Sequence, residues 1–126
     1  MSLIFDASAL VAIERGDRDV VALLKSEFQA GRAPLTHGAV VGQVWRGGSG
    51  RQARLARFLP ALDVAALDGA LGRRAGMLLG RARAADVVDA ALVLLAQDGD
   101  SVLTSDPEDI MRLAVSAGLD VDVMRV

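Results

Sequence analysis

Two residue types that often carry chemistry in proteins are missing or nearly missing from this sequence. It has no cysteine among its 126 residues, which excludes disulfides, thiolate catalysis and cysteine-ligated zinc or iron–sulfur sites. The single histidine, His37, stands alone before an expected helix, and we interpret it as a surface or capping group. Carboxylate oxygens are therefore the main candidates for site chemistry.

Long apolar runs are also absent. The longest, such as residues 90–96, are far too short to cross a bilayer. The N-terminus has neither the basic region nor the long apolar segment of a secretory signal. We therefore expect a cytoplasmic protein that does not enter a membrane.

The composition is that of one folded domain. Hydrophobic residues make up 52% of the chain and charged residues 24%, close to ordinary globular values. A chain of this length buries a substantial core without disulfides. Because no repeat, low-complexity tract or proline-rich linker interrupts it, residues 1–126 are expected to form a single domain.

Charge is distributed unevenly, although the net charge is only -2. Residues 46–83 contain eight arginines and two aspartates, whereas residues 84–126 contain nine acidic residues and two arginines. A cationic face beside an anionic pocket suits a polyanion that is brought to a metal ion. For any single arginine, a solvated surface position is the simpler interpretation.

Short strand-like runs alternate with longer segments that have helical spacing. The expected strands are 2–5, 33–36, 62–65, 101–104 and 121–124. The expected helices are 20–28, 38–46, 50–59, 68–79, 86–97 and 107–117. This alternation predicts an α/β fold, a three-layer α/β/α sandwich with a central parallel sheet, in which ligands bind beyond the carboxyl ends of the strands.

Aspartates stand where the ligand site of such a sheet is expected. Asp6 and Asp106 follow the first and fourth expected strands, and Asp89 lies in the first turn of an otherwise apolar helix. Three aspartates in one crevice repel one another unless a cation lies among them, and oxygen ligands suit Mg²⁺ or Mn²⁺. Such an ion lowers the pKa of a bound water and stabilises phosphoryl charge, so phosphodiester hydrolysis is the natural chemistry.

Some of these aspartates also have a purely structural explanation. Asp106 before Pro107 has the pattern of an N-cap followed by proline at the first helical position. For Asp86 and Asp109 we favour capping over a role in the site, because a cap alone stabilises a helix by about 1 kcal/mol.

Four short segments occur in order along nearly the whole chain: LIFDASAL at 3–10, VVGQVWRG at 40–47, DVVDA at 86–90 and LTSD at 103–106. Together they resemble the PIN domain, and in particular the ribonuclease toxins of VapC-type toxin–antitoxin pairs. The resemblance implies an acidic pocket that binds Mg²⁺ or Mn²⁺ and endonucleolytic hydrolysis of RNA by a metal-activated water, which leaves a 5′-phosphate and a 3′-hydroxyl. It also implies a homodimer and inhibition by an antitoxin on a separate chain.

The resemblance matches Asp6, Asp89 and Asp106 to three acidic positions of the family. It implies that Asp6 and Asp89 are metal ligands and that Asp106 binds the ion directly or through water. Where the family typically has a glutamate, this chain has Gln43, which keeps an acceptor but lacks the charge and should hold the ion less tightly. Either the Gln43 amide oxygen still ligates or orients a water, or Asp86, one turn before Asp89, supplies the charge. We favour the second.

Weaker candidates surround these positions. Ser8 and Thr104 are placed to orient ligands or phosphate oxygens, although hydroxyl residues beside an aspartate also form turns. Trp45 is expected in the core or in a partner contact. Arginines on one stretch are candidates for contact with RNA phosphates or with an acidic antitoxin segment. They are Arg46, Arg51, Arg54 and Arg57.

Three other functional interpretations stay open. The main alternative is a catalytically degenerate PIN domain that binds protein or RNA, with Gln43 as the disabling change, and metal affinity separates the two. A receiver domain needs further acids after the first strand and a late lysine, whereas the only lysine is Lys25. A haloacid dehalogenase-like phosphatase needs an aspartate at the position of Ser8.

Overall fold

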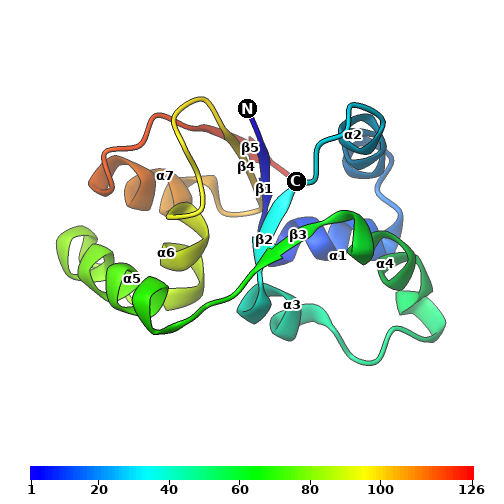
Figure 1. Ribbon diagram of the computed structural model, residues 1–126, viewed down its shortest axis with the longest axis horizontal. Coiled ribbons are helices and arrows are strands. Elements are labelled where there is room, and N and C mark those ends of the chain that lie inside the picture. The colour runs from blue at the N-terminus through cyan, green and yellow to red at the C-terminus, as the bar shows by residue number, and fades with distance from the viewer.

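The structure is a computed structural model that describes residues 1–126. A five-stranded parallel sheet forms its centre (Figure 1). The strands are β1 (Leu3–Phe5), β2 (Leu35–His37), β3 (Asp63–Ala65), β4 (Ser101–Thr104) and β5 (Asp122–Arg125). Every neighbouring pair runs parallel, and the order across the sheet is β3-β2-β1-β4-β5. The predicted α/β class with a central parallel sheet is confirmed.

Helices cover both faces of this sheet (Figure 1). One side carries α1 (Ala7–Arg15), α2 (Arg18–Gln29), α3 (Gly38–Val44) and α4 (Ala53–Phe58). The other side carries α5 (Gly69–Ala82), α6 (Val87–Val93) and α7 (Pro107–Ser116). Short 3₁₀ turns, η1 (Gly50–Gln52) and η2 (Leu59–Ala61), flank α4. The layers are those of the predicted α/β/α sandwich, and none of its helices is long and apolar enough to span a membrane.

Most element bounds lie within two residues of the prediction, and two helices differ. The expected helix 50–59 is broken into η1 and α4 at Gln52, whose backbone at φ −90° and ψ 1° departs from α-helical geometry. The expected helix 86–97 ends at Val93. After that residue the chain tightens into i→i−3 hydrogen bonds, from Leu95 N–H to Leu92 O and from Ala96 N–H to Val93 O.

One helix, α1, lies where the sequence reading predicts none. Asp6 is its N-cap, and Gly16 closes it in the left-handed conformation at φ +76°. Its buried residues recur at helical spacing against the sheet. They are Ala9, Leu10, Ala12 and Ile13.

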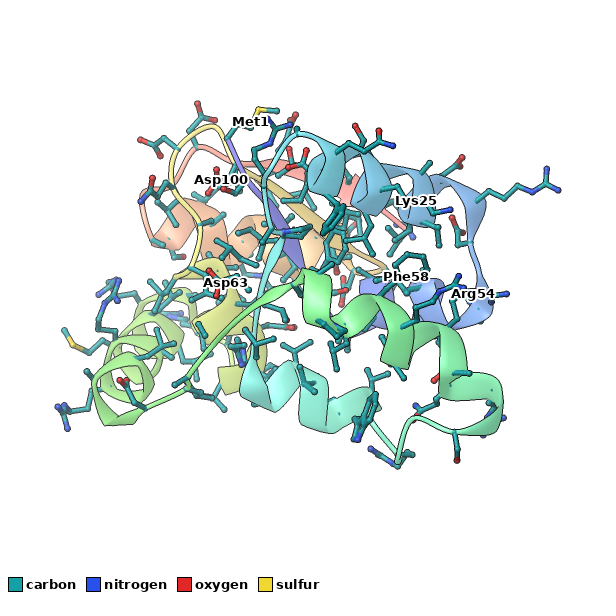
Figure 2. All side chains as sticks on the ribbon, turned by 45° about the vertical axis from the view of Figure 1, so that its right-hand side comes forward. Met1, Lys25, Arg54, Phe58, Asp63 and Asp100 are labelled. Atoms are coloured by element: carbon teal, nitrogen blue, oxygen red, sulfur yellow. The ribbon has the colours of Figure 1, made fainter.

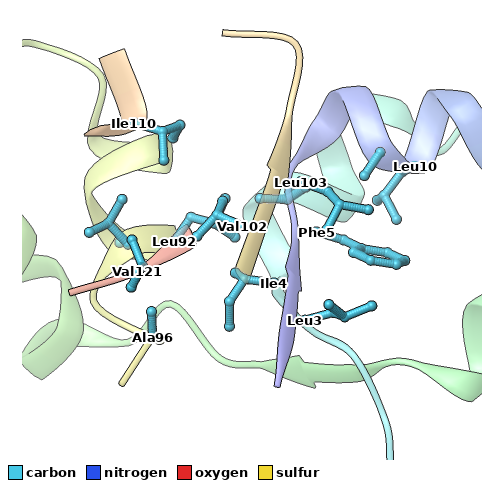
Figure 3. Packing of buried hydrophobic residues seen from close by; sticks show 14 of the residues in the cluster. Leu3, Ile4, Phe5, Leu10, Leu92, Ala96, Val102, Leu103, Ile110 and Val121 are labelled. Atoms are coloured by element: carbon cyan, nitrogen blue, oxygen red, sulfur yellow. The ribbon is translucent and has the colours of Figure 1, made fainter. Parts of the chain in front are cut away.

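The apolar core lies on both faces of β1 and β4 (Figure 3). Ile4 pairs with Val102 and Phe5 pairs with Leu103 across these strands, and all four are fully buried. Because alternate strand residues face opposite sides, Ile4 and Val102 support the α6 and α7 layer, whereas Phe5 packs near Leu10 of α1 (Figure 3). Two central strands buried on both faces hold their carboxyl ends in fixed positions.

The strand order creates a switch point at the carboxyl end of β1. From β1 the chain moves to β2 and β3 on one side, and it later returns to β4 and β5 on the other. Ligands of open α/β sheets bind at such a point. Asp6 follows β1 directly, and its backbone N–H donates to Leu103 O of β4 at 3.3 Å.

Candidate active site

Asp6 is held rigidly at the switch point. Its side chain is only 7% exposed, and one carboxylate oxygen, Oδ1, accepts from the Ala9 backbone N–H at 3.0 Å. Burial raises the pKa of Asp6 above its ordinary 3.8, while hydrogen bonds from Thr104, Ala9 and Ser8 oppose this rise. Because burial favours the protonated form of Asp6, a bound cation would stabilise its charged form. The capping bond to Ala9 explains only part of the environment of this carboxylate.

Asp89 is the most perturbed carboxyl group of the protein. It is half-buried in the first turn of α6, and its pKa is raised from 3.8 to about 6. Burial is the main cause, and the neighbouring negative charges add to it. These charges belong to Asp86, Asp6, Asp106 and Asp109. The charges of Asp6 and Asp106 thus reach Asp89, and we call these five aspartates the acidic cluster. No three of them lie close enough together to form a metal site by themselves.

Asp106 has the backbone position of a cap without the capping bond. It precedes α7, with Pro107 at the first helical position as predicted, but its carboxylate accepts no hydrogen bond from the helix. Its backbone N–H donates instead to Thr104 Oγ1 at 3.0 Å. The Asp106 carboxylate is exposed and free to bind a ligand.

The two remaining acids of the cluster behave differently from each other. Asp86 caps α6 as predicted, with Oδ1 accepting from the backbone N–H groups of Val88 at 3.0 Å and Asp89 at 3.1 Å. The prediction that Asp109 is a cap is wrong. Because α7 begins at Pro107, Asp109 lies inside the first turn, where it forms an ion pair with Arg112.

Both hydroxyl candidates lie beside Asp6. Thr104 is fully buried, and Ser8 Oγ lies 2.6 Å from Ser105 Oγ. These contacts place small polar groups next to the carboxylates, and their roles toward a ligand stay predictions.

Gln43 shares no cavity with Asp86, Asp89 or Asp109. The acidic residues Asp86, Asp89 and Asp109 line a cavity of about 340 Å³. Gln43 is exposed on α3 and lines a separate cavity of about 400 Å³ with Glu14 of α1. The two cavities share no residue, and no hydrogen bond connects them.

Gln52, a residue that the sequence reading passes over, organises this second cavity. It is buried, and its Oε1 accepts from the backbone N–H groups of Arg46 at 2.8 Å and Gly48 at 3.2 Å. Its Nε2 donates to Glu14 Oε1 at 2.7 Å and to Val44 O at 2.8 Å. All four hydrogen-bonding positions of the amide, two donors and two acceptor lone pairs, are engaged, which fixes the glycine-rich turn against α1.

Two of the predicted RNA-binding arginines have structural contacts of their own. Arg54 Nη1 donates to Glu14 O at 3.1 Å, and Arg46 Nη1 donates to Gly42 O at 3.1 Å and to Trp45 O at 2.7 Å. Arg51 is exposed, lines the same cavity as Gln43 and Gln52, and takes part in no ion pair. Trp45 is half-buried and packs against the core, in agreement with one of its two expected roles.

His37 is the clearest error of the sequence reading. It is fully buried, not a surface group, and its side chain makes no capping bond to α3. Its Nε2 lies 2.9 Å from Val88 O in the first turn of α6. A lone histidine gives no sequence signal for such a contact, because its partner stands 51 positions away.

The donor set suits a hard divalent cation. All candidate ligands are carboxylate or hydroxyl oxygens, the type that Mg²⁺ and Mn²⁺ prefer, and the mutual repulsion at Asp89 is relieved by positive charge. No three Asp, Glu or His side chains form a preformed metal cage. An ion that keeps several of its waters and takes few protein ligands fits this arrangement.

Comparisons with known proteins define the fold. No family model matches the sequence, and no curated protein matches it. Comparison with solved structures shows that the chain has the three-layer architecture of a PIN-like α/β/α domain. It superposes on a chain of the crystal structure of VapBC2 from Rickettsia felis bound to a DNA fragment from their promoter, with a TM-score of 0.71. That match has 12% sequence identity and covers 98% of each chain, and it confirms the fold that the sequence resemblance predicted.

Proposed function

We propose that this protein is a metal-dependent endoribonuclease, the toxin of a type II toxin–antitoxin pair. The observation that carries the proposal is Asp89, whose carboxyl pKa is raised to about 6 by burial and by four surrounding aspartates at the switch point of a PIN-like fold. The structural similarity to a VapBC2 complex supports the same conclusion.

We assign the divalent ion to Asp6 and Asp89, with Asp106 binding it directly or through water and Asp86 adding charge. When bound, the ion supplies a nucleophilic water near neutral pH and stabilises charge on the phosphoryl group. Asp6 offers a fixed oxygen because its backbone and one carboxylate oxygen are already held. Ser8 and Thr104 orient ligands beside it.

We place the RNA contact on the arginine-rich segment of residues 46–83. Arginine recognises phosphate through charge and paired hydrogen bonds. Arg51 is the freest candidate, whereas Arg46 and Arg54 would offer to phosphate only the guanidinium N–H groups that backbone carbonyls do not occupy. Binding that depends on these charges weakens as salt concentration rises.

We assign an antitoxin to a groove between α2 and α4. A cavity of about 470 Å³ is lined there by Leu24, Phe28 and Phe58, and Phe28 is 68% exposed. The Arg57 guanidinium lies 5.0 Å from the centre of the Phe58 ring, and Lys25 lies 6.0 Å from it (Figure 2). Aromatic surface with unpaired cations beside it suits an amphipathic segment that carries acidic residues.

We also propose a homodimer, and we place its contact on α7 and the edge strand β5. Met111 and Val115 are exposed on α7 and line a hollow together with Val123 of β5, and Val115 is 69% exposed. An apolar face of this kind on a protein surface marks an interaction site. Val115→Asp is expected to give a monomer in light scattering, whereas Val87→Asp, at an exposed valine outside this face, leaves the oligomeric state unchanged.

One observation favours a second candidate, a catalytically silent PIN domain that acts as a binding module. Gln43 lacks the charge of the family glutamate, and it lines a different cavity from Asp86, Asp89 and Asp109. In that case RNA or a protein partner binds and is not cleaved.

Calorimetric titration with Mn²⁺ separates the two functions. Wild type is expected to bind the ion, and Asp89→Asn is expected to lose binding because it removes a ligand charge. Asp19→Asn is the matched control, since Asp19 is an exposed first-turn aspartate of α2. If neither wild type nor Asp19→Asn binds Mn²⁺, the nuclease proposal fails and the silent module is favoured. Binding that depends on Asp89 justifies a search for the RNA target.

A further inference from the structure

His37 breaks a local rule at the start of α3. The N-cap position favours Ser, Thr, Asp or Asn, whose side chains accept a backbone hydrogen bond, yet His37 makes no such bond. Its ring is fully buried, and Nδ1 has no hydrogen-bond partner in the protein. An unpaired buried polar atom is destabilising, so neither capping nor packing accounts for an imidazole at this position.

The other ring nitrogen connects the end of β2 to α6. Nε2 lies 2.9 Å from Val88 O, and because a carbonyl oxygen only accepts, this contact requires the proton on Nε2. Val88 directly precedes Asp89 and follows Asp86 by two positions. The His37 side chain therefore hydrogen-bonds to the backbone between Asp86 and Asp89.

The first turn of α6 has few other restraints. The helix is only seven residues long, and the Asp86 cap is the other side-chain hydrogen bond to its first turn. Asp6 lies at the end of β1, which pairs with β2 next to His37. The hydrogen bond from His37 of β2 to Val88 of α6 therefore connects the helix that carries Asp89 to the strand that pairs with β1, which ends at Asp6.

We propose that His37 is a positioning residue of the acidic site, which fixes the first turn of α6 through the Val88 carbonyl and so sets where the Asp89 carboxylate lies. The inference rests on the proposed function for its consequence, because a displaced Asp89 binds a divalent ion less well. His37 itself contacts neither the ion nor the substrate.

Four variants test this role. His37→Leu removes the donor and keeps an apolar side chain of moderate size. His37→Gln places an amide N–H near the position of Nε2, whereas His37→Asn carries the same amide on a side chain too short to reach Val88. Thr36→Val is the matched control, because Thr36 is also fully buried with an unpartnered hydroxyl but faces the opposite side of the sheet.

One measurement is made on wild type alone, and two are made on every protein. Nitrogen-15 spectra of the wild-type ring report which nitrogen is protonated, amide hydrogen exchange reports the opening of α6, and calorimetry reports Mn²⁺ affinity. We expect the proton on Nε2 in wild type. His37→Leu and His37→Asn should exchange faster at Val88–Ala90 and bind Mn²⁺ about tenfold more weakly, the scale found for residues that orient metal ligands. His37→Gln should recover most of both losses, and Thr36→Val should match wild type.

Each contrary result has a distinct meaning. A proton on Nδ1 overturns the hydrogen bond to Val88 and with it the proposal. Equal Mn²⁺ affinities of wild type and His37→Leu overturn the positioning role while the proposed nuclease stands. If His37→Leu does not fold, equal exchange rates and affinities of the Gln and Asn variants overturn it. If wild type binds no Mn²⁺, the proposed function fails, and unchanged α6 exchange in the variants overturns the positioning role as well.

Discussion

The Asp86 carboxylate accepts a hydrogen bond from the Asp89 backbone and repels the Asp89 side chain. Asp86 Oδ1 accepts from the Asp89 backbone N–H at 3.1 Å, while the charge of the same carboxylate raises the pKa of the Asp89 side chain. The capping bond stabilises the helix, whereas the repulsion makes the ionised form of Asp89 less favourable. A cation near both carboxylates relieves the repulsion without disturbing the cap.

Asp86→Asn separates these two effects. Asparagine is as good an N-cap as aspartate, so the helix should keep its stability within about 0.5 kcal/mol. The loss of charge should lower the Asp89 pKa toward its ordinary value and weaken Mn²⁺ binding about tenfold. Carbon-13 titration of the Asp89 carboxyl measures the first effect and calorimetry the second. An unchanged Mn²⁺ affinity would exclude Asp86 from the metal site.

Asp89→Asn is expected to stabilise the metal-free protein at neutral pH. Folding raises the Asp89 pKa from 3.8 to about 6, so the native state binds this proton more tightly than the unfolded chain. Stability from this group is therefore present at low pH and is lost as pH rises through about 6. After allowance for solvent screening, Asp89→Asn should gain about 1–2 kcal/mol at pH 7.5.

Urea unfolding with a chelator present measures this gain. The difference between Asp89→Asn and wild type should be close to zero at about pH 4, where Asp89 is protonated in the native state. A gain of the same size at both pH values would show that its cause is not the titration of Asp89.

Gln43→Glu tests the departure from the family pattern. The sequence predicts that the added charge raises Mn²⁺ affinity, because a carboxylate is a stronger ligand for a hard cation than an amide. The structure makes this a demanding test, since Gln43 lies beside Glu14 in the second cavity. Calorimetry of Gln43→Glu beside Gln29→Glu, an exposed glutamine at the end of α2, gives the comparison. A constant that stays the same or becomes weaker rejects the prediction.

Asp100 is expected to contribute more to stability than to the site. Its buried carboxylate accepts from the Ser2 N–H at 2.7 Å and from the Gln97 N–H at 2.8 Å, and so ties the N-terminus to the entry of β4 (Figure 2). Asp100→Ala should cost about 2–4 kcal/mol in unfolding free energy, because two buried N–H groups lose a charged acceptor. Asp98→Ala removes one exposed bond to Asp120 N–H and should cost about 1 kcal/mol or less. Equal losses in denaturant unfolding would refute this assignment.

Gly48→Ala should disturb Trp45. A methyl group added at Gly48 would overlap the Trp45 ring, and the backbone there has φ +73°. Gly50 has φ +59° and open space around it, so Gly50→Ala carries the backbone penalty alone, about 1 kcal/mol. Gly48→Ala should cost about 1–3 kcal/mol more and shift tryptophan fluorescence, because the ring or the turn has to move. Similar stabilities and spectra for the two variants would rule out the steric contact.

The sequence predicts those parts of the molecule that have local signals. Apolar strand runs and their alternation with helices are enough for the layer order, and aspartates at strand ends are enough to locate the switch point. The overlooked α1 also had such signals, since Asp6 reads as a cap and Gly16 as a helix stop. Asp6 was interpreted through its chemistry alone, although the structure shows that one side chain both caps α1 and faces the acidic cluster.

The parts that could not be predicted depend on contacts between distant segments. His37 meets Val88 across 51 positions, and Gln52 meets Glu14 across 38. Neither residue belongs to a periodic pattern, so tertiary packing alone decides where its polar atoms bond. The placement of Gln43 in a different cavity from Asp86, Asp89 and Asp109 is of the same kind, because it depends on tertiary packing and not on the residues of α3 alone.

The position of β1 in the middle of the sheet has a consequence for synthesis. Asp6 leaves the ribosome about 100 residues before its hydrogen-bond partner Thr104, and β4 is the strand that completes its surroundings. Contacts of such long range form late in folding. A nascent chain therefore cannot assemble the acidic cluster until about 100 residues beyond Asp6 have been translated, and products that end before β4 lack the site altogether.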